Sequence, residues 1–192
     1  IEVNPLDLYI EVVKRAGNKI KGDFINGSFF SHSKMISIST LVSNGKILAE
    51  HLPHDNVKRG TFVVYKNGDV GVEMIDFISK HPKLKDIKFA IGGFNIMPQG
   101  KTVRQQLKDE WFDYNTVGYS CWRSMIGWSK AKNKALIVIT PNTDAEAGSK
   151  LMKNLGCDCA VGLDSGGSTC GRFNNEMTKS TTRALHNIIR WN

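Results

Sequence analysis

The stretch KALIVITPNTDAEAGSKLMKNLGCDCAVGLDSGGST, residues 134–169, contains two apolar runs on either side of a segment with helical features. The first run, Lys134–Thr140, is short and largely apolar, which is typical of a strand buried on both faces. The second run, Cys159–Leu163, has the same character. The stretch therefore predicts a strand–helix–strand unit, which we expect to be a parallel, right-handed crossover.

The segment between the two runs carries signals for both ends of a helix. Thr143-Asp144-Ala145-Glu146 has the form of a capping box, in which the Thr hydroxyl and the Glu carboxylate satisfy free backbone N–H groups. Ala147, Leu151 and Leu155 recur at a helical spacing, so we expect them to form the apolar face. Gly156 is placed to end the helix.

The loop Asp164–Thr169 directly follows the second predicted strand, at the end where α/β sheets usually bind ligands. Gly166 and Gly167 allow backbone N–H groups to approach an anion closely, and Ser168 and Thr169 add hydroxyl donors. The loop lacks the lysine of a P-loop and the spacing of a dinucleotide fingerprint. A glycine-rich turn that binds nothing is the alternative, and the loop alone does not decide between the two.

The first half of the chain is rich in hairpin signals. Asn44-Gly45 and Asn67-Gly68 each lie between β-rich runs, and both residue types tolerate the positive φ of tight turns. The predicted strands are Ile36–Val42 with Ile47–His51, and Thr61–Tyr65 with Val70–Met74. A further short strand, Phe89–Ile91, is closed by two glycines. The sequence thus predicts a mixed α/β (α+β) fold, with a β-hairpin-rich first half and a β-α-β unit in the second half around a mixed sheet.

Three segments have no clear period. Residues 6–16 and 181–191 are each compatible with a helix or a strand, and residues 102–114 with a helix or a loop.

Length and composition bound the class of protein. The chain has 192 residues, of which 41% are hydrophobic and 23% charged, and this excludes a mostly disordered or collagen-like chain. We expect a single domain over residues 1–192. No stretch approaches the roughly 20 apolar residues of a membrane span. The chain starts at Ile1 without a signal peptide, which we interpret as a trimmed form.

The net charge of +8 and the pI of about 9.4 favour a polyanionic partner: nucleic acid, anionic lipid or a phosphate-bearing glycan. The basic residues are spread out, and the densest groups are Lys80–Lys88 and Lys130–Lys134. A solvated, lysine-rich surface explains the charge equally well.

The four cysteines do not predict a zinc site, because no paired C-x2-C elements occur and no histidine lies near them in sequence. Cys157 and Cys159 fall where a buried strand begins, as free thiols often do. A disulfide that involves Cys121 or Cys170 is the alternative for these two residues.

Two further segments could bind ligands. Asn26-Gly27-Ser28-Phe29-Phe30 combines an amide and a hydroxyl with two aromatic rings, a set that can hold a sugar; a strand end with a buried Phe pair is the alternative. Arg123 could clamp phosphate, because guanidinium geometry matches phosphate oxygens; a surface arginine in an ion pair is the alternative.

Taken in order, these segments resemble the phosphodiester glycosidase family over residues 22–190. Asn26–Phe30 is similar to the family's Asn-Gly-Gly-Phe/Tyr-Phe. The other matching segments are Ala90–Gly93 with Pro98–Gly100 (the glycine-rich middle), Arg123–Gly127 (Arg-Thr/Ser-x-x-Gly), Leu163–Thr169 (Leu-Asp-Gly-Gly-Gly-Ser-Ser/Thr), and Arg183, Ala184 and Asn187 (the closing segment). Ser28 and Ser165 replace glycines of the family pattern, and Ser31-His32 stands where the family often has an Asp.

The resemblance implies hydrolysis of a sugar-1-phosphodiester at the anomeric C–O bond, which releases a free sugar and a phosphomonoester. It implies that Asp164, Arg123 and Asn26 are catalytic, with Arg123 and the loop of Gly166, Gly167, Ser168 and Thr169 on the phosphate. Asp164 would activate water or stabilise the cationic sugar, while Asn26 and Ser28 would bind hydroxyls. Gly93 is expected to line the substrate site.

The charge suits an anionic glycan such as teichoic acid or a phosphorylated capsule, and the compact length suggests a bacterial or phage member that is secreted, on the cell surface or phage-associated. A divalent cation, calcium or magnesium, would find hard oxygen ligands in Asp164 and Asn26. A non-catalytic glycan-binding module of a phage or cell-surface assembly is the first alternative. It is compatible with Ser165, which replaces a glycine in the loop that resembles the family's. A nucleic-acid-binding protein is the second and rests on charge alone; it predicts salt-sensitive binding.

Overall fold

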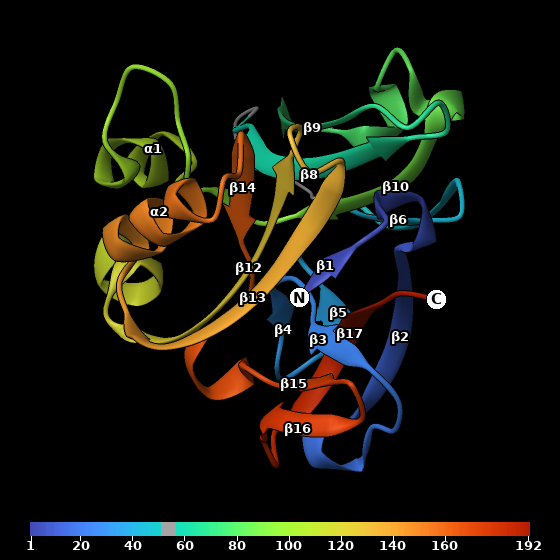
Figure 1. Ribbon diagram of the computed structural model, residues 1–192, viewed down its shortest axis with the longest axis vertical. Helices are drawn as coiled ribbons and strands as arrows, with labels where there is room; N and C mark the ends of the chain where they lie inside the picture. The colour runs from blue at the N-terminus through green and yellow to red at the C-terminus, as the bar shows by residue number, and fades with distance from the viewer. Residues whose placement is uncertain (51–56) are drawn as a thin grey trace.

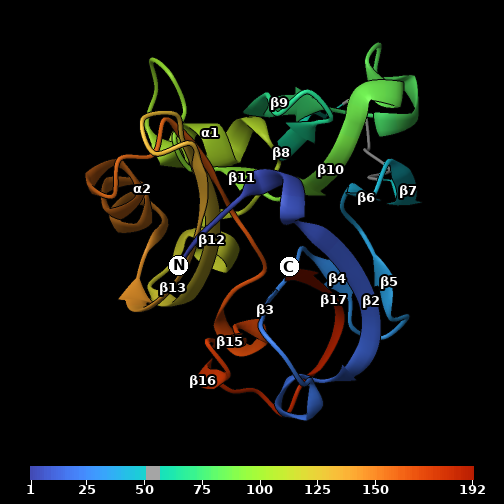
Figure 2. The same ribbon diagram turned by 45° about the vertical axis from the view of Figure 1, so that its right-hand side comes forward.

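The computed structural model describes residues 1–50 and 57–192, and its strands form three five-stranded sheets and a small two-stranded one (Figure 1, Figure 2). The first sheet has the order β1 (Glu2–Val3), β13 (Lys134–Thr143), β12 (Cys121–Ser129), β14 (Cys159–Gly162), β11 (Phe94–Asn95). The second has the order β7 (Lys46–Ala49), β6 (Leu41–Ser43), β10 (Ile87–Gly92), β8 (Arg59–Tyr65), β9 (Val70–Ile75). The third has the order β16 (Glu176–Lys179), β15 (Gly171–Phe173), β3 (Phe24–Asn26), β17 (Ala184–Arg190), β2 (Tyr9–Ala16). The small sheet pairs β4 (Phe30–Ser31) with β5 (Ile36–Ser37).

Short helical elements connect the strands. The α-helices are α1 (Val103–Asp109) and α2 (Ala145–Asn154). The 3₁₀ turns are η1 (Pro5–Asp7), η2 (Gly17–Lys19), η3 (Ile78–Lys80), η4 (Leu84–Asp86) and η6 (Gly166–Ser168), and η5 (Tyr114–Gly118) is a π-turn. The mixed α+β class predicted from the sequence is confirmed. Within the described ranges, no helix is long and apolar enough to cross a membrane.

The first sheet is buried on both faces, as the apolar run predicted. Alternate residues of β13 enter different cores: Ile137 packs with side chains of all three large sheets, while Leu136 packs under the two α-helices. The helices therefore cover one face of this sheet, and the other two sheets lie against its opposite face (Figure 1). This arrangement fixes the ends of β12 and β14, where the candidate site lies.

The predicted strand–helix–strand unit is present. β12 pairs antiparallel with both β13 and β14, so the two strands of the unit run parallel with β12 between them. Two details of the predicted helix are wrong. Asp144, not Thr143, caps it by accepting a hydrogen bond from Ala147 N at 2.7 Å, because Thr143 still belongs to β13. The Glu146 carboxylate accepts from Arg104 N at 3.2 Å and thereby links α2 to α1.

The buried face of α2 was also assigned wrongly. Ala147 is exposed, and Leu151 and Leu155 are half-buried. The face that packs against the sheet instead consists of Ala145, Gly148, Ser149 and Met152. These residues follow the mixed three- and four-residue spacing that keeps side chains on one face of a helix, which a strict spacing of four does not.

Both predicted hairpins form. Asn44 and Gly45 have φ of 50° and 76° between β6 and β7, and Gly68 has φ of 92° between β8 and β9. The expected strand Ile36–Val42 is split into β5 and β6, which belong to different sheets. His51, the expected end of the second strand, lies outside the described residues.

The three ambiguous segments are now assigned. Residues 9–16 and 184–190 are paired strands, β2 and β17, and residues 103–109 form helix α1. All four cysteines, including Cys121 and Cys170, are free thiols.

Candidate active site

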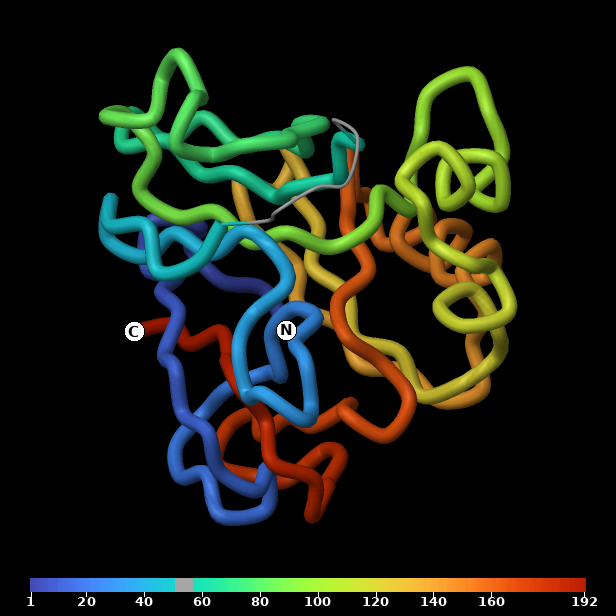
Figure 3. Tube along the Cα trace, turned by 180° about the vertical axis from the view of Figure 1, so that it is seen from behind, coloured from blue at the N-terminus to red at the C-terminus, as the bar shows by residue number. Residues whose placement is uncertain are grey.

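Asp164 lies where three distant parts of the chain meet. Its backbone N–H donates to Gly27 O at 3.2 Å, just after β3, and the preceding Leu163 N–H donates to Ser124 O of β12 at 2.9 Å. In Figure 3 the orange segment after β14 descends beside the blue segments of the first third of the chain. The carboxyl end of β14, where the loop was expected, is thus brought to the end of β3.

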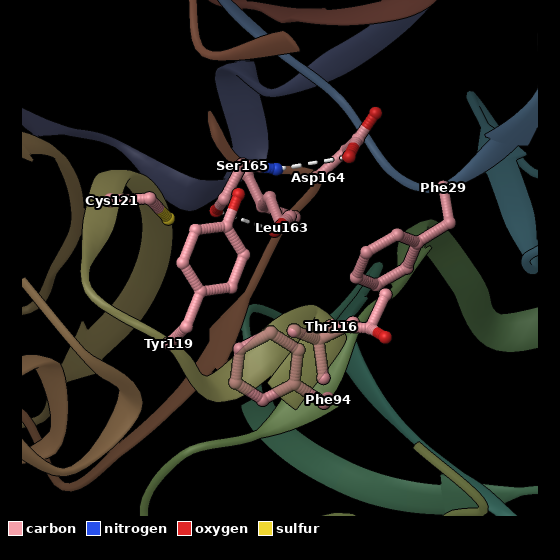
Figure 4. Close-up of a pocket in the computed structure, with 9 residues that line it drawn as sticks. Phe29, Phe94, Thr116, Tyr119, Cys121, Leu163, Asp164 and Ser165 are labelled. Carbon is pink, nitrogen blue, oxygen red and sulfur yellow. Dashed lines mark hydrogen bonds between the residues drawn. The ribbon is translucent and has the colours of Figure 1, made fainter. Parts of the chain in front are cut away.

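A cavity of about 140 Å³ opens beside Asp164. It is lined by Phe29, Phe94, Thr116, Val117, Tyr119, Cys121, Leu163, Asp164 and Ser165. Figure 4 shows the Tyr119, Phe94 and Phe29 rings below Asp164 and Ser165. The Phe29 and Phe94 centroids are 6.3 Å apart, and Tyr119 is 46% exposed at the opening. The cavity therefore offers apolar ring faces on one side and a carboxyl group on the other.

The Asp164 carboxyl group is held on both sides. Ser165 N donates to its Oδ1 at 3.0 Å, and the Ser168 side chain also hydrogen-bonds to it. Burial raises the pKa of Asp164, and this outweighs the lowering by Ser168, by the Ser165 N–H and by the positive charges of His32 and Arg183. Perturbed carboxyl groups of this kind are common among catalytic acids and bases.

Arg183 and His32 lie next to each other in the electrostatic surroundings of this carboxyl group. Arg183 Nη1 donates to Ser168 Oγ at 3.2 Å and lies 3.4 Å from His32 Nε2. The guanidinium lies against Gly167, where a Cβ would come within 2.8 Å of Nη2. The His32 ring is itself packed edge-on against Phe30, at 4.4 Å between centroids. Arg183, Ser168 and His32 thus form a polar group beside Asp164, in which Arg183 carries the positive charge.

Sequence reasoning did not assign Arg183 or His32 to the site, because they are 151 positions apart in the chain. Two features of the sequence pointed to these residues: the closing segment around Arg183 and the departure from the family pattern at Ser31-His32. Neither pattern shows that the two side chains meet.

Arg123 does not line the cavity, and this geometry does not present its guanidinium to a phosphate group there. Its side chain is fully buried, and Nε donates to Thr143 O at 3.0 Å. Nη1 donates to Val117 O at 3.0 Å, and Nη2 donates to Tyr119 O at 2.7 Å. Arg123 therefore holds the wall of the cavity from behind.

Asn26 and Ser28 are likewise committed to the protein. Asn26 Nδ2 donates to Asp164 O at 2.6 Å, and its Oδ1 accepts from Ser124 Oγ at 2.6 Å and from Cys170 N at 3.0 Å. Ser28 Oγ donates to the Gly92 carbonyl. Both residues are buried, so they position Asp164 and its neighbours and do not face the cavity.

The remaining expected residues divide into two groups. Thr169 Oγ1 donates to Trp122 O at 2.8 Å, and a Cβ at Gly93 would lie 2.3 Å from Gly162 O, so these two shape the scaffold. Gly166, with φ of 63°, and Gly167 begin η6. Their N–H groups have no hydrogen-bond partner within residues 1–50 and 57–192, so they are free to meet an anion.

The residues around Asp164 offer few free ligands for the expected divalent cation. Asn26 Oδ1, the second expected oxygen ligand, already accepts two hydrogen bonds in a buried position. Among the described residues, no cluster of three or more His, Cys, Asp or Glu side chains is arranged to bind a metal ion. The residues around Asp164 therefore do not fit a protein-bound calcium or magnesium site.

The family model for phosphodiester glycosidases matches residues 24–190. Curated protein sequences give no significant match. The catalytic domain of zebrafish N-acetylglucosamine-1-phosphodiester alpha-N-acetylglucosaminidase, auto-inhibited by its pro-peptide, is similar in structure, with a TM-score of 0.81 at 14% identity over 99% of this chain and 75% of that one. A hypothetical protein from Synechocystis is similar with a TM-score of 0.72 at 12% identity, over 98% of this chain and 57% of that one. At these identities the structural likeness shows a shared fold.

Proposed function

Because the chain belongs to the phosphodiester glycosidase family and is thus a glycosidase that acts on phosphodiester-linked sugars, we propose that its substrate is a phosphate-containing glycan of the teichoic-acid or capsule type. The bond that breaks is the anomeric C–O bond, and water completes the free sugar while the phosphomonoester leaves. The observation that carries this proposal is that Asp164, which lines an aromatic cavity, also has Arg183 and His32 as electrostatic neighbours.

A phosphomonoester is a good leaving group, so its departure needs charge neutralisation more than strong general-acid help. Arg183 lies against Gly167 and donates to Ser168, so its guanidinium and the N–H groups of Gly166 and Gly167, unpaired within the described residues, are the donors best suited to hold phosphate oxygens. This assignment moves the phosphate contact from Arg123 to Arg183.

Asp164 serves the sugar side of the reaction. In its ionised form the carboxylate either accepts a proton from the attacking water or stabilises the positive charge that develops at the anomeric carbon. Asn26 holds its backbone carbonyl and Ser165 N–H holds its Oδ1, so the group is fixed before substrate binds. Fixed charges of this kind stabilise a transition state without reorganisation.

The aromatic walls are suited to a sugar ring. Phe29 and Tyr119 offer accessible apolar faces on which the C–H face of a sugar can lie, and the fully buried Phe94 ring supports them from below. The name of the zebrafish relative gives N-acetylglucosamine as its sugar, and we extend that sugar to this enzyme as part of the proposal. A cell-wall or capsule polymer as substrate places the enzyme outside the cell, on its surface or on a phage particle, and we propose a bacterial or phage source.

The test is release of free sugar from UDP-N-acetylglucosamine and from purified teichoic acid, each with and without EDTA. We expect release by the wild type and none by Asp164→Asn, whereas the exposed Asp109→Asn on α1 should match the wild type. Binding of the glycan without release would establish the non-catalytic module instead. The EDTA arm measures whether turnover needs a metal ion.

A further inference from the structure

A second polar cavity lies on the edge of the third sheet, away from Asp164. It has a volume of about 330 Å³ and lies between β2, the end of η2 and the end of β17. We call it the basic cavity. Its charged lining residues are Glu11, Arg15, Lys19, Lys21 and Arg190. Its apolar lining residues, Val13 and Ile20, are buried and supply no polar group.

Arg190 is fixed in this cavity by the protein itself. Its Nε donates to Glu11 in an ion pair, and Nη1 donates to Lys21 O at 3.0 Å and to Asp23 O at 3.1 Å. Gly22, with φ of 72°, lets the turn close around the guanidinium, because a Cβ there would be 3.2 Å from Nη1. The second terminal nitrogen, Nη2, has no hydrogen-bond partner in the described chain. One guanidinium is therefore oriented before any ligand arrives.

The other three cations of the basic cavity are uncompensated. Arg15, Lys19 and Lys21 are exposed, and none of them forms an ion pair or a side-chain hydrogen bond with the residues that the structure describes. Since Arg190 already neutralises Glu11, the cavity presents an excess of three positive charges. Such a cavity attracts phosphate groups.

We propose that the basic cavity binds phosphate groups of the polymeric substrate at a distance from the bond that is cleaved; this inference rests on the proposed function. β17 runs past both places, because Arg183 precedes the strand and Arg190 ends it, while Arg15 of β2 lies opposite Leu185. The cavity thus extends along β17 from Arg15 to Arg190, and at about 3.4 Å per residue Arg190 is roughly 24 Å from Arg183 along the strand. A sugar nucleotide is too short to reach both, whereas a polymer with a phosphodiester in every repeat reaches both at once.

The lining favours such a glycan over nucleic acid. Single-stranded nucleic acids are held by aromatic side chains on which bases stack, together with a basic groove. The basic cavity has no aromatic lining residue among those described. Phosphate is therefore the group it is suited to recognise, and the rest of the polymer is left free.

The first arm of the test measures binding without catalysis. Linear polyphosphate, which carries no glycosidic bond, is titrated calorimetrically at several NaCl concentrations. The variant Arg15→Gln/Lys19→Gln/Lys21→Gln should bind at least tenfold more weakly at low salt. The slope of log affinity against log salt should also become shallower by about 2, as expected for the loss of three phosphate contacts.

A charge-matched control separates the cavity from general attraction. Lys130→Gln/Lys150→Gln/Lys153→Gln removes the same charge from exposed positions elsewhere and should bind polyphosphate within twofold of the wild type. An equal loss in both variants would show that net charge alone binds the polymer and would overturn the proposal. Duplex DNA that competes as strongly as polyphosphate would assign the cavity to nucleic acid and would also overturn it.

The second arm measures turnover. In the cavity variant, KM for teichoic acid should rise about tenfold, while kcat/KM for UDP-N-acetylglucosamine should stay unchanged. A matching loss on the sugar nucleotide would place the cavity in the reaction site and refute a remote role. If the wild type hydrolyses neither substrate, the proposed function fails, and the polyphosphate titration still decides whether the cavity binds phosphate.

Discussion

Replacement of Arg123 by Met tests whether this arginine supports the cavity wall or contacts phosphate. The change removes the donors for three carbonyls, those of Thr143, Val117 and Tyr119. A buried acceptor left without a partner costs about 1–3 kcal/mol. The Thr143 bond is buried and should incur most of that cost, whereas the other two are part-buried and their carbonyls can turn to water. We expect the free energy of unfolding to fall by about 3 kcal/mol.

The same change should loosen the wall that carries Thr116, Val117 and Tyr119. We expect faster hydrogen exchange of amides 114–119 and a tenfold rise in KM for UDP-N-acetylglucosamine, while inhibition by UDP, the phosphate-bearing product, falls much less. Urea unfolding, hydrogen exchange and steady-state kinetics measure these quantities. Arg183→Met is the contrast: Arg183 is exposed, so unfolding should change by less than about 0.5 kcal/mol while UDP inhibition is largely lost.

An Arg123→Met variant that unfolds like the wild type but no longer binds UDP would contradict a supporting role for Arg123. That result would return the phosphate contact to Arg123 and would mean that the three carbonyls do not need its donors. Retained UDP inhibition in Arg183→Met would remove Arg183 from the phosphate site.

Four further predictions concern Asp164 and Gly93. Asp164→Asn should abolish turnover and keep the fold, and circular dichroism that shows an unfolded variant would contradict this. Because burial raises the pKa of Asp164, turnover that needs the carboxylate should decline as pH falls through a value above that of an ordinary aspartate, and a flat acid limb would remove the ionised form from the mechanism. Because the pKa of Asp164 is raised in the folded protein, its contribution to folding is fully present below the unfolded pKa and is lost as pH rises through the folded pKa. Asp164→Asn does not undergo this loss, so its free energy of unfolding relative to that of the wild type should increase as pH rises from acid to neutral, as measured by urea unfolding. Gly93→Ala should destabilise the protein by about 3 kcal/mol, since its Cβ would lie 2.3 Å from Gly162 O, whereas Gly71→Ala, with no atom within 4 Å, should be tolerated; equal stability of the two would contradict the close approach.

The position of Asp164 could be predicted because its signals are local. An apolar run, a helix with a terminal glycine and a second apolar run establish a strand end, and the glycines after Asp164 establish a loop. The hairpins at Asn44-Gly45 and Asn67-Gly68 were predictable for the same reason. Each of these features depends on residues that are neighbours in sequence.

The roles of the surrounding side chains could not be predicted, because they depend on contacts between distant residues. Arg123 is an apt phosphate ligand by chemistry, but the carbonyls that occupy it come from the η5 segment and the end of β13. Arg183 and His32 come together only once β17 and β4 are in place. The buried face of α2 was missed by one residue. Thr143 belongs to β13, so the helix is capped by Asp144, one position later than predicted.

Ser165 was the one feature of the sequence that favoured a non-catalytic module, because it replaces a glycine of the family pattern. In the structure its φ is −134°, which any residue adopts, so the backbone does not require glycine there. Its hydroxyl donates to Leu163 O at 3.0 Å and accepts from Ser124 N at 3.3 Å, and so it connects the ends of β14 and β12 beneath Asp164. Gly166, with φ of 63°, is the position where glycine is needed, and it is present. The substitution thus adds two hydrogen bonds next to Asp164 and leaves Gly166 and Gly167 in place, so it gives no reason to prefer the non-catalytic module.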